Sequence, residues 1–178
     1  MEGAARRQEI LSQLAETTKP ISASRFAKQF GVSRQVIVGD IALLRASGEE
    51  IIATARGYKK EDTSGKKISK IAVQHRADQT RQELETIVSL GGEIIDVIVE
   101  HDIYGELVGG LHISTQEDVE AFMVAYEESR ASLLSQLTNG IHLHTISYTE
   151  DCVLKAIKES LTQKGILYQG NEKAGESL

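Results

Sequence analysis

Two histidines in the second half of the chain have the spacing of a metal-binding pair. His142 and His144 are separated by one residue in the run IHLHT. In an extended strand, residues two apart point to the same face, so the two imidazoles would lie side by side. Neutral imidazole is the commonest metal ligand in proteins, and it is the majority form near pH 7. The alternative is a strand pair that only hydrogen-bonds to its neighbours.

Two further candidate ligands lie upstream, in the run IAVQHRADQTRQELE. We expect His75 to end a strand and Glu83 to lie in the first turns of the helix that follows it. Three nitrogens and one carboxylate oxygen suit zinc, iron(II), nickel or manganese, and they leave coordination positions open for another ligand. The residue types and spacing therefore suggest a metal site at His75, Glu83, His142 and His144.

Charge and cysteine content indicate what kind of chain must position these residues. The 178 residues suit one large domain or two small ones. Residues 1–60 carry ten Lys and Arg against six Asp and Glu, a net of +4, whereas residues 61–178 carry ten against twenty, a net of −10. With one cysteine there is no disulfide framework, and no apolar run is long enough to span a bilayer. We expect a cytoplasmic protein with no membrane partner, in which a basic module is joined to an acidic one.

The basic module, residues 1–60, has the turn signals of a winged helix-turn-helix. Apolar spacing predicts helices over 6–16, 22–30 and 34–46, with Gly31 between the second and the third. The third helix would present Ser33, Arg34 and Gln35 to base edges, because Arg and Gln can make bidentate contacts to guanine and adenine. Residues 50–60 predict a hairpin wing, whose Arg56 and Lys59 could reach phosphates. The alternative is a three-helix bundle that binds a partner protein.

The acidic module, residues 68–178, follows a polar linker over 61–67 and alternates strands with helices. Strands are predicted over 68–75, 94–100, 106–114 and 165–168, with another carrying the two histidines, and helices over 78–90, 115–129 and 150–164. This order predicts an α+β fold, with helices on one face of a mixed sheet. His101 and Tyr104 fall in the turn over 101–105, where His101 would either line a pocket or stabilise the turn.

Several segments together resemble a known family. SRQVIVGDIALLRASG followed by IIATARGY is similar to the helix-turn-helix of the niacin-responsive transcriptional repressors. IAVQH, DVIVEHDIYGEL and IHLHTI are similar to three segments of the 3H domain, named for its histidines, that follows it there. The resemblance covers about residues 6–168. It implies a winged helix-turn-helix joined to an α/β sandwich of the 3H type, which binds a ligand and a metal.

The resemblance also implies a function and a ligand set. The function is repression of NAD-biosynthesis and niacin-uptake genes, with operator DNA and nicotinic acid as partners. The metal ligands of the family correspond to His75, Glu83, His142 and His144. Two departures are Asp102, where the family usually has proline, and Gly39, where it has a larger polar residue.

Two further expectations complete the interpretation. Repressors of this architecture bind DNA as homodimers, so the operator should be pseudo-palindromic. The competing function is a metal-dependent enzyme with a three-His-one-Glu site and an accessory DNA-binding module. Barrel-type metal oxygenases would need many short, evenly spaced strands, whereas helices alternate with strands here. The sequence therefore favours a repressor over an enzyme.

Overall fold

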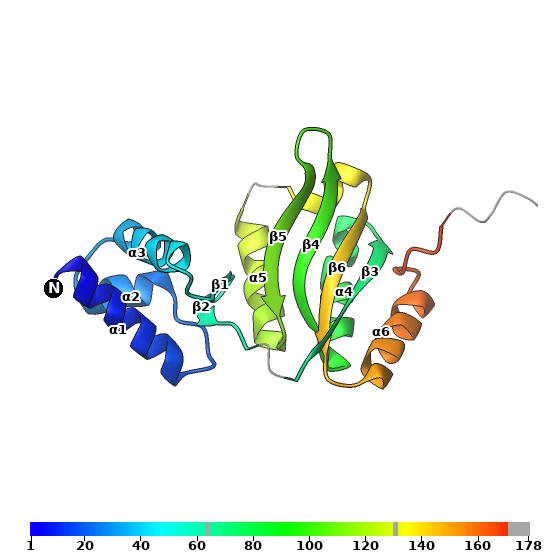
Figure 1. The fold of residues 1–178 in the computed structure, drawn as a ribbon. Helices are drawn as coiled ribbons and strands as arrows, with labels where there is room; N and C mark the ends of the chain where they lie inside the picture. The colour runs from blue at the N-terminus through cyan, green and yellow to red at the C-terminus, as the bar shows by residue number, and fades with distance from the viewer. Residues whose placement is uncertain (63–64, 130–131, 171–178) are drawn as a thin grey trace, which may run out of the picture. The chain divides into compact units, whose positions relative to one another are not determined.

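Figure 1 shows the computed structural model, which describes residues 1–62, 65–129 and 132–170. The chain forms two compact units, divided between residues 64 and 65. Among the described residues, no helix is long and apolar enough to cross a membrane.

The N-terminal unit consists of three helices and a hairpin, namely α1 (Gly3–Glu16), α2 (Ala23–Phe30), α3 (Arg34–Ala46), β1 (Ile51–Thr54) and β2 (Gly57–Lys60). The Ser22 hydroxyl caps α2 by accepting a hydrogen bond from a backbone N–H, and Ser33 caps α3 in the same way. Gly31 ends α2 with a φ of 65°, a left-handed conformation that glycine adopts at no steric cost. Helix, glycine turn and helix thus form as predicted.

Close backbone packing joins the hairpin to the helices. Ile21 and Tyr58 exchange two backbone hydrogen bonds of 2.8 and 2.9 Å. At Gly57, with a φ of 131°, a Cβ would lie 2.5 Å from the Ile21 carbonyl, so only glycine permits this approach. The core beneath the helices is mainly aliphatic, as the absence of tryptophan requires: Ile10, Leu14, Ile21, Phe26, Ile37, Ile41, Leu44 and Ile51.

A buried carboxylate fixes α1 against α3. Asp40 on α3 is 4% exposed, and it accepts a hydrogen bond of 2.6 Å from Arg6 Nε and one of 3.3 Å from Arg7 Nη1. Both arginines lie in the first turns of α1, which begins at Gly3, three residues before the predicted start. Apolar spacing does not identify the three added residues, Gly3, Ala4 and Ala5, because none of them belongs to the core.

The C-terminal unit is an antiparallel sheet with helices packed on one face. The strands are β3 (Lys67–Gln74), β4 (Glu93–His101), β5 (Gly105–Ile113) and β6 (Ile141–Tyr148), in the order β3-β6-β4-β5. The helices are α4 (Thr80–Ser89), α5 (Gln116–Glu128) and α6 (Asp151–Gln163), and Figure 1 shows α4 and α5 behind the strands. Helices and strands share one aliphatic core, which includes Ile71, Val73, Leu84, Ile87, Ile94, Ile113, Val119, Ile146, Ile157 and Leu161.

The structure differs from the predicted elements of this unit at four points. All pairings in the four-stranded sheet are antiparallel, so the sheet is not mixed. Residues 165–168 form no strand, because Leu167 makes only one isolated bridge, to Val73. A 3₁₀ turn, η2 (Leu134–Thr138), precedes β6 where the sequence suggested no element. A second 3₁₀ turn, η1 (Ala77–Gln79), precedes α4.

Candidate metal centre and ligand cavity

Strand β6 places two histidines on the helix-covered face of the sheet. His142 and His144 are 4% and 3% exposed, and their Nε2 atoms lie 3.1 Å apart. Their cross-strand partners on β3 are Val73 and Ile71, both core residues. The alternation of strand side chains thus turns both imidazoles inward, as the spacing predicted.

His75 reaches the same point from the end of β3. Gly140, with a φ of 83°, comes so close that a Cβ there would lie 2.4 Å from the His75 carbonyl oxygen. Glycine therefore allows the chain before β6 to pass directly against His75. The His75 ring then lies edge-on to His142, with 5.0 Å between the ring centroids.

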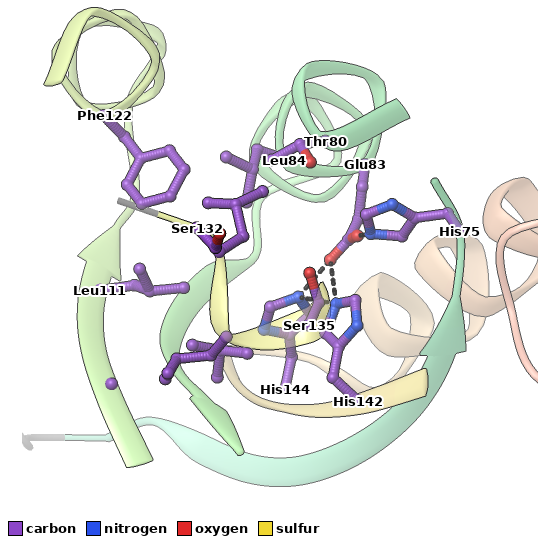
Figure 2. Close-up of a pocket in the computed structure, with 14 residues that line it drawn as sticks. His75, Thr80, Glu83, Leu84, Leu111, Phe122, Ser132, Ser135, His142 and His144 are labelled. Carbon is purple, nitrogen blue, oxygen red and sulfur yellow. Dashed lines mark hydrogen bonds and ion pairs between the residues drawn. The ribbon is translucent and has the colours of Figure 1, made fainter. Parts of the chain in front are cut away.

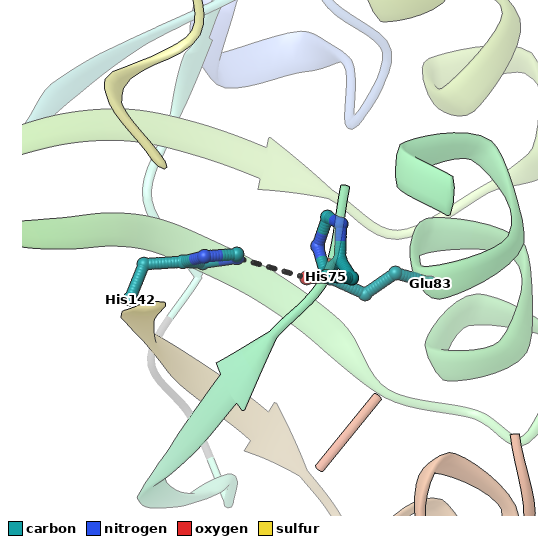
Figure 3. A group of neighbouring side chains, drawn as sticks. All are labelled: His75, Glu83 and His142. Atoms are coloured by element: carbon teal, nitrogen blue, oxygen red, sulfur yellow. Dashed lines mark ion pairs between the residues drawn. The ribbon is translucent and has the colours of Figure 1, made fainter. Parts of the chain in front are cut away.

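Glu83 projects from α4 into the centre of the three histidines. It is 1% exposed, and one oxygen contacts His75 Nε2 while the other contacts His144 Nε2 and lies 3.5 Å from His142 Nε2. Figure 2 shows the carboxylate directed at the imidazoles, and Figure 3 shows His142 facing it from β6 and His75 from the segment after β3. The structure thus brings together all four residues that the sequence singled out.

Backbone carbonyls determine which nitrogen of each histidine faces Glu83. His75 Nδ1 lies 2.7 Å from the Arg76 carbonyl oxygen, His142 Nδ1 2.9 Å from that of Gly140, and His144 Nδ1 2.7 Å from that of Asp96. A carbonyl oxygen only accepts hydrogen bonds, so each Nδ1 carries the proton and donates it. In the neutral ring, each Nε2 then presents a lone pair to the common centre, the arrangement that usually orients a metal-binding histidine.

Burial and charge act against each other at this centre. Burial alone would raise the pKa of Glu83, but His144, His142 and His75 lower it, and the net direction is down. Burial alone would lower the pKa of His144, whereas Glu83 and the Asp96 carbonyl raise it, and the net direction is up. Positive charge at the centre is therefore favoured, whether it comes from a proton or from a cation.

The donor set fits a divalent transition metal. One ligand atom from each of His75, Glu83 and His142 lies within 4.8 Å of the others. Within residues 1–62, 65–129 and 132–170, neither Glu83 oxygen nor His75 Nε2 has a hydrogen-bond partner. Buried polar atoms are nearly always satisfied, and a cation bound to the Nε2 lone pairs and the carboxylate would satisfy these.

The four residues line one end of a cavity of about 250 Å³. Its other walls are mostly apolar, and they come from α4, β4, β5, α5 and the segment before β6: Leu84, Val97, Leu111, Phe122, Leu133 and Leu134. Figure 2 shows Leu84, Leu111 and Phe122 around this space. Thr80 also lines the cavity; it is 7% exposed, and its hydroxyl has no hydrogen-bond partner among the described residues. An apolar pocket with a few polar groups at one end is the usual form of a small-molecule site.

The sequence did not single out most of these wall residues. Thr80 was detectable in principle, because it precedes Glu83 by three residues and so shares its helix face. Leu134 lies in η2, which has neither the length nor the periodicity that identifies a helix. Phe122 follows from the periodicity of α5 only as a core residue. Nothing local indicates that these side chains surround a cavity.

His101 and Tyr104 lie at the tip of the β4–β5 hairpin, and they do not line the cavity. His101 Nδ1 accepts a hydrogen bond of 3.1 Å from the Ile103 N–H and one of 3.4 Å from the Tyr104 N–H. The Tyr104 side chain is 71% exposed. The geometry is that of turn stabilisation, the alternative interpretation of His101.

The predicted DNA-contacting residues lie on the N-terminal unit. Ser33, Arg34 and Gln35 are exposed at the start of α3. Arg56 lies in the turn of the β1–β2 hairpin, and Lys59 lies in β2, both half-buried. The recognition helix and the wing are thus present, and their contacts with DNA stay a prediction.

Each of the two units matches a known domain family. Residues 6–59 match an HTH domain, and residues 68–170 match the 3H domain. The first unit thus has the form of a DNA-binding domain, and the second contains the cavity and the candidate metal centre. The chain belongs to the 3H-domain family and carries the HTH domain at its N-terminus.

Relatives of similar length carry names that agree with this class. The chain is 38% identical over 164 residues to a probable transcription repressor NiaR of Thermotoga maritima, covering 92% of this chain and 94% of the relative. It is 37% identical over 169 residues to the transcription repressor NadR of Bacillus subtilis, covering 93% and 94%. These relatives are named as repressors and not as enzymes, which agrees with the predicted class and confirms the family resemblance.

Proposed function

We propose that this chain represses genes of NAD biosynthesis and niacin uptake, with nicotinic acid as co-repressor and a divalent metal in the C-terminal unit. The observation that carries the proposal is the centre at Glu83. Three imidazoles, each with Nδ1 bound to a backbone carbonyl, direct Nε2 at one buried carboxylate in the wall of an apolar cavity. The repressor names of the two relatives support the regulatory part.

The metal would be held by His75, Glu83, His142 and His144. When bound, it supplies positive charge and open coordination positions at the polar end of the cavity. Zinc, iron(II), nickel and manganese all suit three imidazoles and one carboxylate, and availability in the cell decides among them. One ion per chain is expected.

The size and lining of the cavity support nicotinic acid as the effector. Drug-sized ligands occupy roughly 300–1,000 Å³, so about 250 Å³ suits a molecule with a single ring. The apolar walls suit the faces of a flat aromatic ring, and the Thr80 hydroxyl offers one hydrogen bond. A small anion has little surface to bury, so the charged end of the cavity must supply most of its affinity. A domain of net charge −10 would otherwise repel a carboxylate.

The DNA-binding part rests on the winged helix-turn-helix. Arg34 and Gln35 are exposed at the start of α3, where recognition helices contact base edges. We propose that two copies bind a pseudo-palindromic operator as a homodimer, in the cytoplasm where the chromosome lies. Nicotinic acid would favour the arrangement of the dimer that matches both half-sites.

Operator binding by the full-length, metal-loaded protein tests the proposal. An operator selected from random duplexes would be titrated with the protein, with and without nicotinic acid, and again after chelation. We expect nicotinic acid to tighten binding about 5–150-fold, only with metal present, and operator DNA to tighten nicotinic acid binding by the same factor. Benzoic acid, which lacks the ring nitrogen, and nicotinamide, which lacks the carboxylate, are the matched ligands. Equal operator affinity in all conditions would contradict the co-repressor role.

A further inference from the structure

The four-stranded sheet has one face that the helices do not cover. Ala72, Leu143, Ile98 and Val108 are successive cross-strand partners on β3, β6, β4 and β5. Directly paired residues of an antiparallel sheet point to the same side. The adjacent row, Ile71, His144, Val97 and Gly109, points into the core and the cavity. The first row therefore lies on the opposite face, which we call the open face.

The open face is apolar at its centre and exposed toward its edges. Ile98 is 6% exposed, yet it is not part of the core that the helices share with the sheet. Val108 is 59% exposed, and Ile141, two residues before Leu143 on β6 and therefore on the same face, is 37% exposed. An apolar row across all four strands is unusual on a surface that remains in water, and such patches mark interaction sites.

Charges at two opposite corners of the open face indicate what packs there. Lys70 lies two residues before Ala72 on β3, and Glu106 lies two residues before Val108 on β5. These two strands run in opposite directions, so the basic and the acidic residue are at diagonally opposite corners. Consider a second copy related by a two-fold axis that lies in the plane of the face, along the diagonal between the other two corners. This axis places Lys70 of the second copy opposite Glu106 of the first, and Glu106 of the second copy opposite Lys70 of the first. The face is thus complementary in charge to a second copy of itself.

The register of the hairpin gives a second indication. Glu100 and Glu106 are directly opposite each other on β4 and β5, and both are exposed. Like charges in this position destabilise a sheet. A lysine from another molecule at this corner would relieve the repulsion, and the two-fold axis brings Lys70 there.

We propose that a second copy of this chain packs on the open face. In this dimer, Val108, Ile98, Leu143 and Ala72 of both copies form the apolar centre, and Lys70 of each copy meets the partner's Glu106. The axis sets the strands of the two sheets at a large angle, as in orthogonal sheet packing. The inference builds on the homodimer of the proposed function and assigns its interface.

Sedimentation equilibrium of the full-length chain tests the interface. Val108→Arg places a charge on the open face, whereas Val124→Arg places one on α5, where Val124 is also exposed at 47%. Both sites are accessible in the single chain, so neither change should prevent folding. We expect Val108→Arg to weaken dimerisation about tenfold or more, and Val124→Arg to leave it unchanged. Equal dimerisation by the parent and Val108→Arg would overturn the interface and leave the homodimer standing; a monomeric parent would overturn both.

Charge reversal tests the pairing of the corners. Lys70→Glu and Glu106→Lys should each weaken the dimer several-fold, and the double reversal should recover most of the loss. Glu106→Lys also removes the repulsion from Glu100, so the single chain should be as stable as the parent or more so. A purely structural role of Glu106 would instead lower stability and leave dimerisation unchanged. Absence of recovery in the double reversal would overturn the proposed two-fold arrangement.

Discussion

Asp40 in the N-terminal unit and Glu83 in the C-terminal unit are both buried, at 4% and 1% exposure. The groups that face the two carboxylates differ. Asp40 is held by Arg6 and Arg7, whose guanidinium groups are permanently charged and only donate hydrogen bonds. Glu83 is held by three imidazoles, whose Nδ1 protons are donated to backbone carbonyls.

The difference separates a structural carboxylate from a functional one. At Asp40 the charge is neutralised within the unit, and the result is a fixed contact between α1 and α3. At Glu83 an imidazole in its neutral form adds only a lone pair to a negative group, so the charge is balanced by a proton or by a cation. Burial of a carboxylate is therefore a poor guide to its function. Whether the neighbouring groups carry a permanent positive charge decides whether the carboxylate needs a bound cation or proton.

The largest expected effect is the loss of metal from the C-terminal unit. His142→Ala/His144→Ala removes two of the four ligands, and metal content should fall from about one ion per chain to almost none. Elemental analysis of the purified protein measures it. His112→Ala, which removes a histidine outside the cavity, should retain the ion. Undiminished metal in the double variant would overturn the four-residue metal site.

Asp40→Asn should destabilise the N-terminal unit and leave the metal content unchanged. Breaking a buried ion pair costs about 3–5 kcal/mol, and the partial exposure of Arg7 reduces the expected loss to about 2–4 kcal/mol. Urea unfolding, with elemental analysis of the same preparation, checks both halves of the expectation. Unaltered stability would mean that the two arginines do not fix α1 against α3.

Arg34→Ala should weaken DNA binding without altering stability, because Arg34 is exposed. Losing a bidentate base contact costs roughly 1–3 kcal/mol and relaxes base preference at one position. Affinity and selectivity for operator variants would be compared with those of Arg81→Ala, which removes an arginine from the C-terminal unit. If Arg34→Ala bound as tightly and selectively as the parent, α3 would not be the recognition helix.

The smallest effect is expected at Gly39 on α3. This glycine is exposed, and a Cβ there would meet nothing within 4 Å. The fold therefore does not require glycine, and Gly39→Ala should stabilise the protein by about 0.5–1 kcal/mol. Thermal unfolding measures the gain, and operator affinity measured alongside shows whether a methyl group at this position obstructs DNA. A loss of stability would contradict the prediction, and it would mean that α3 requires glycine at position 39 for a reason other than close packing.

The sequence by itself determined the parts that depend on local spacing. Ser22 and Ser33 cap the predicted helices, because N-caps act within three residues. His142 and His144 share a face because strand side chains alternate, and Glu83 lies in the first turn of its helix. His75, expected at the end of the strand before that helix, was proposed with them from residue type and position, and the family resemblance implied the same four residues. Each of these depends on neighbours close in the sequence.

Only the tertiary structure decided what these residues face. Asp40 and Glu83 are both acidic residues on the inner side of a helix, and no local pattern distinguishes them. The arginines at one and the imidazoles at the other come from different elements, and Gly140 brings His75 against β6 by a backbone contact across 65 residues of chain. The cavity and the open face likewise depend on strand order, because pairing β6 between β3 and β4 places the histidine row on one side and the apolar row on the other.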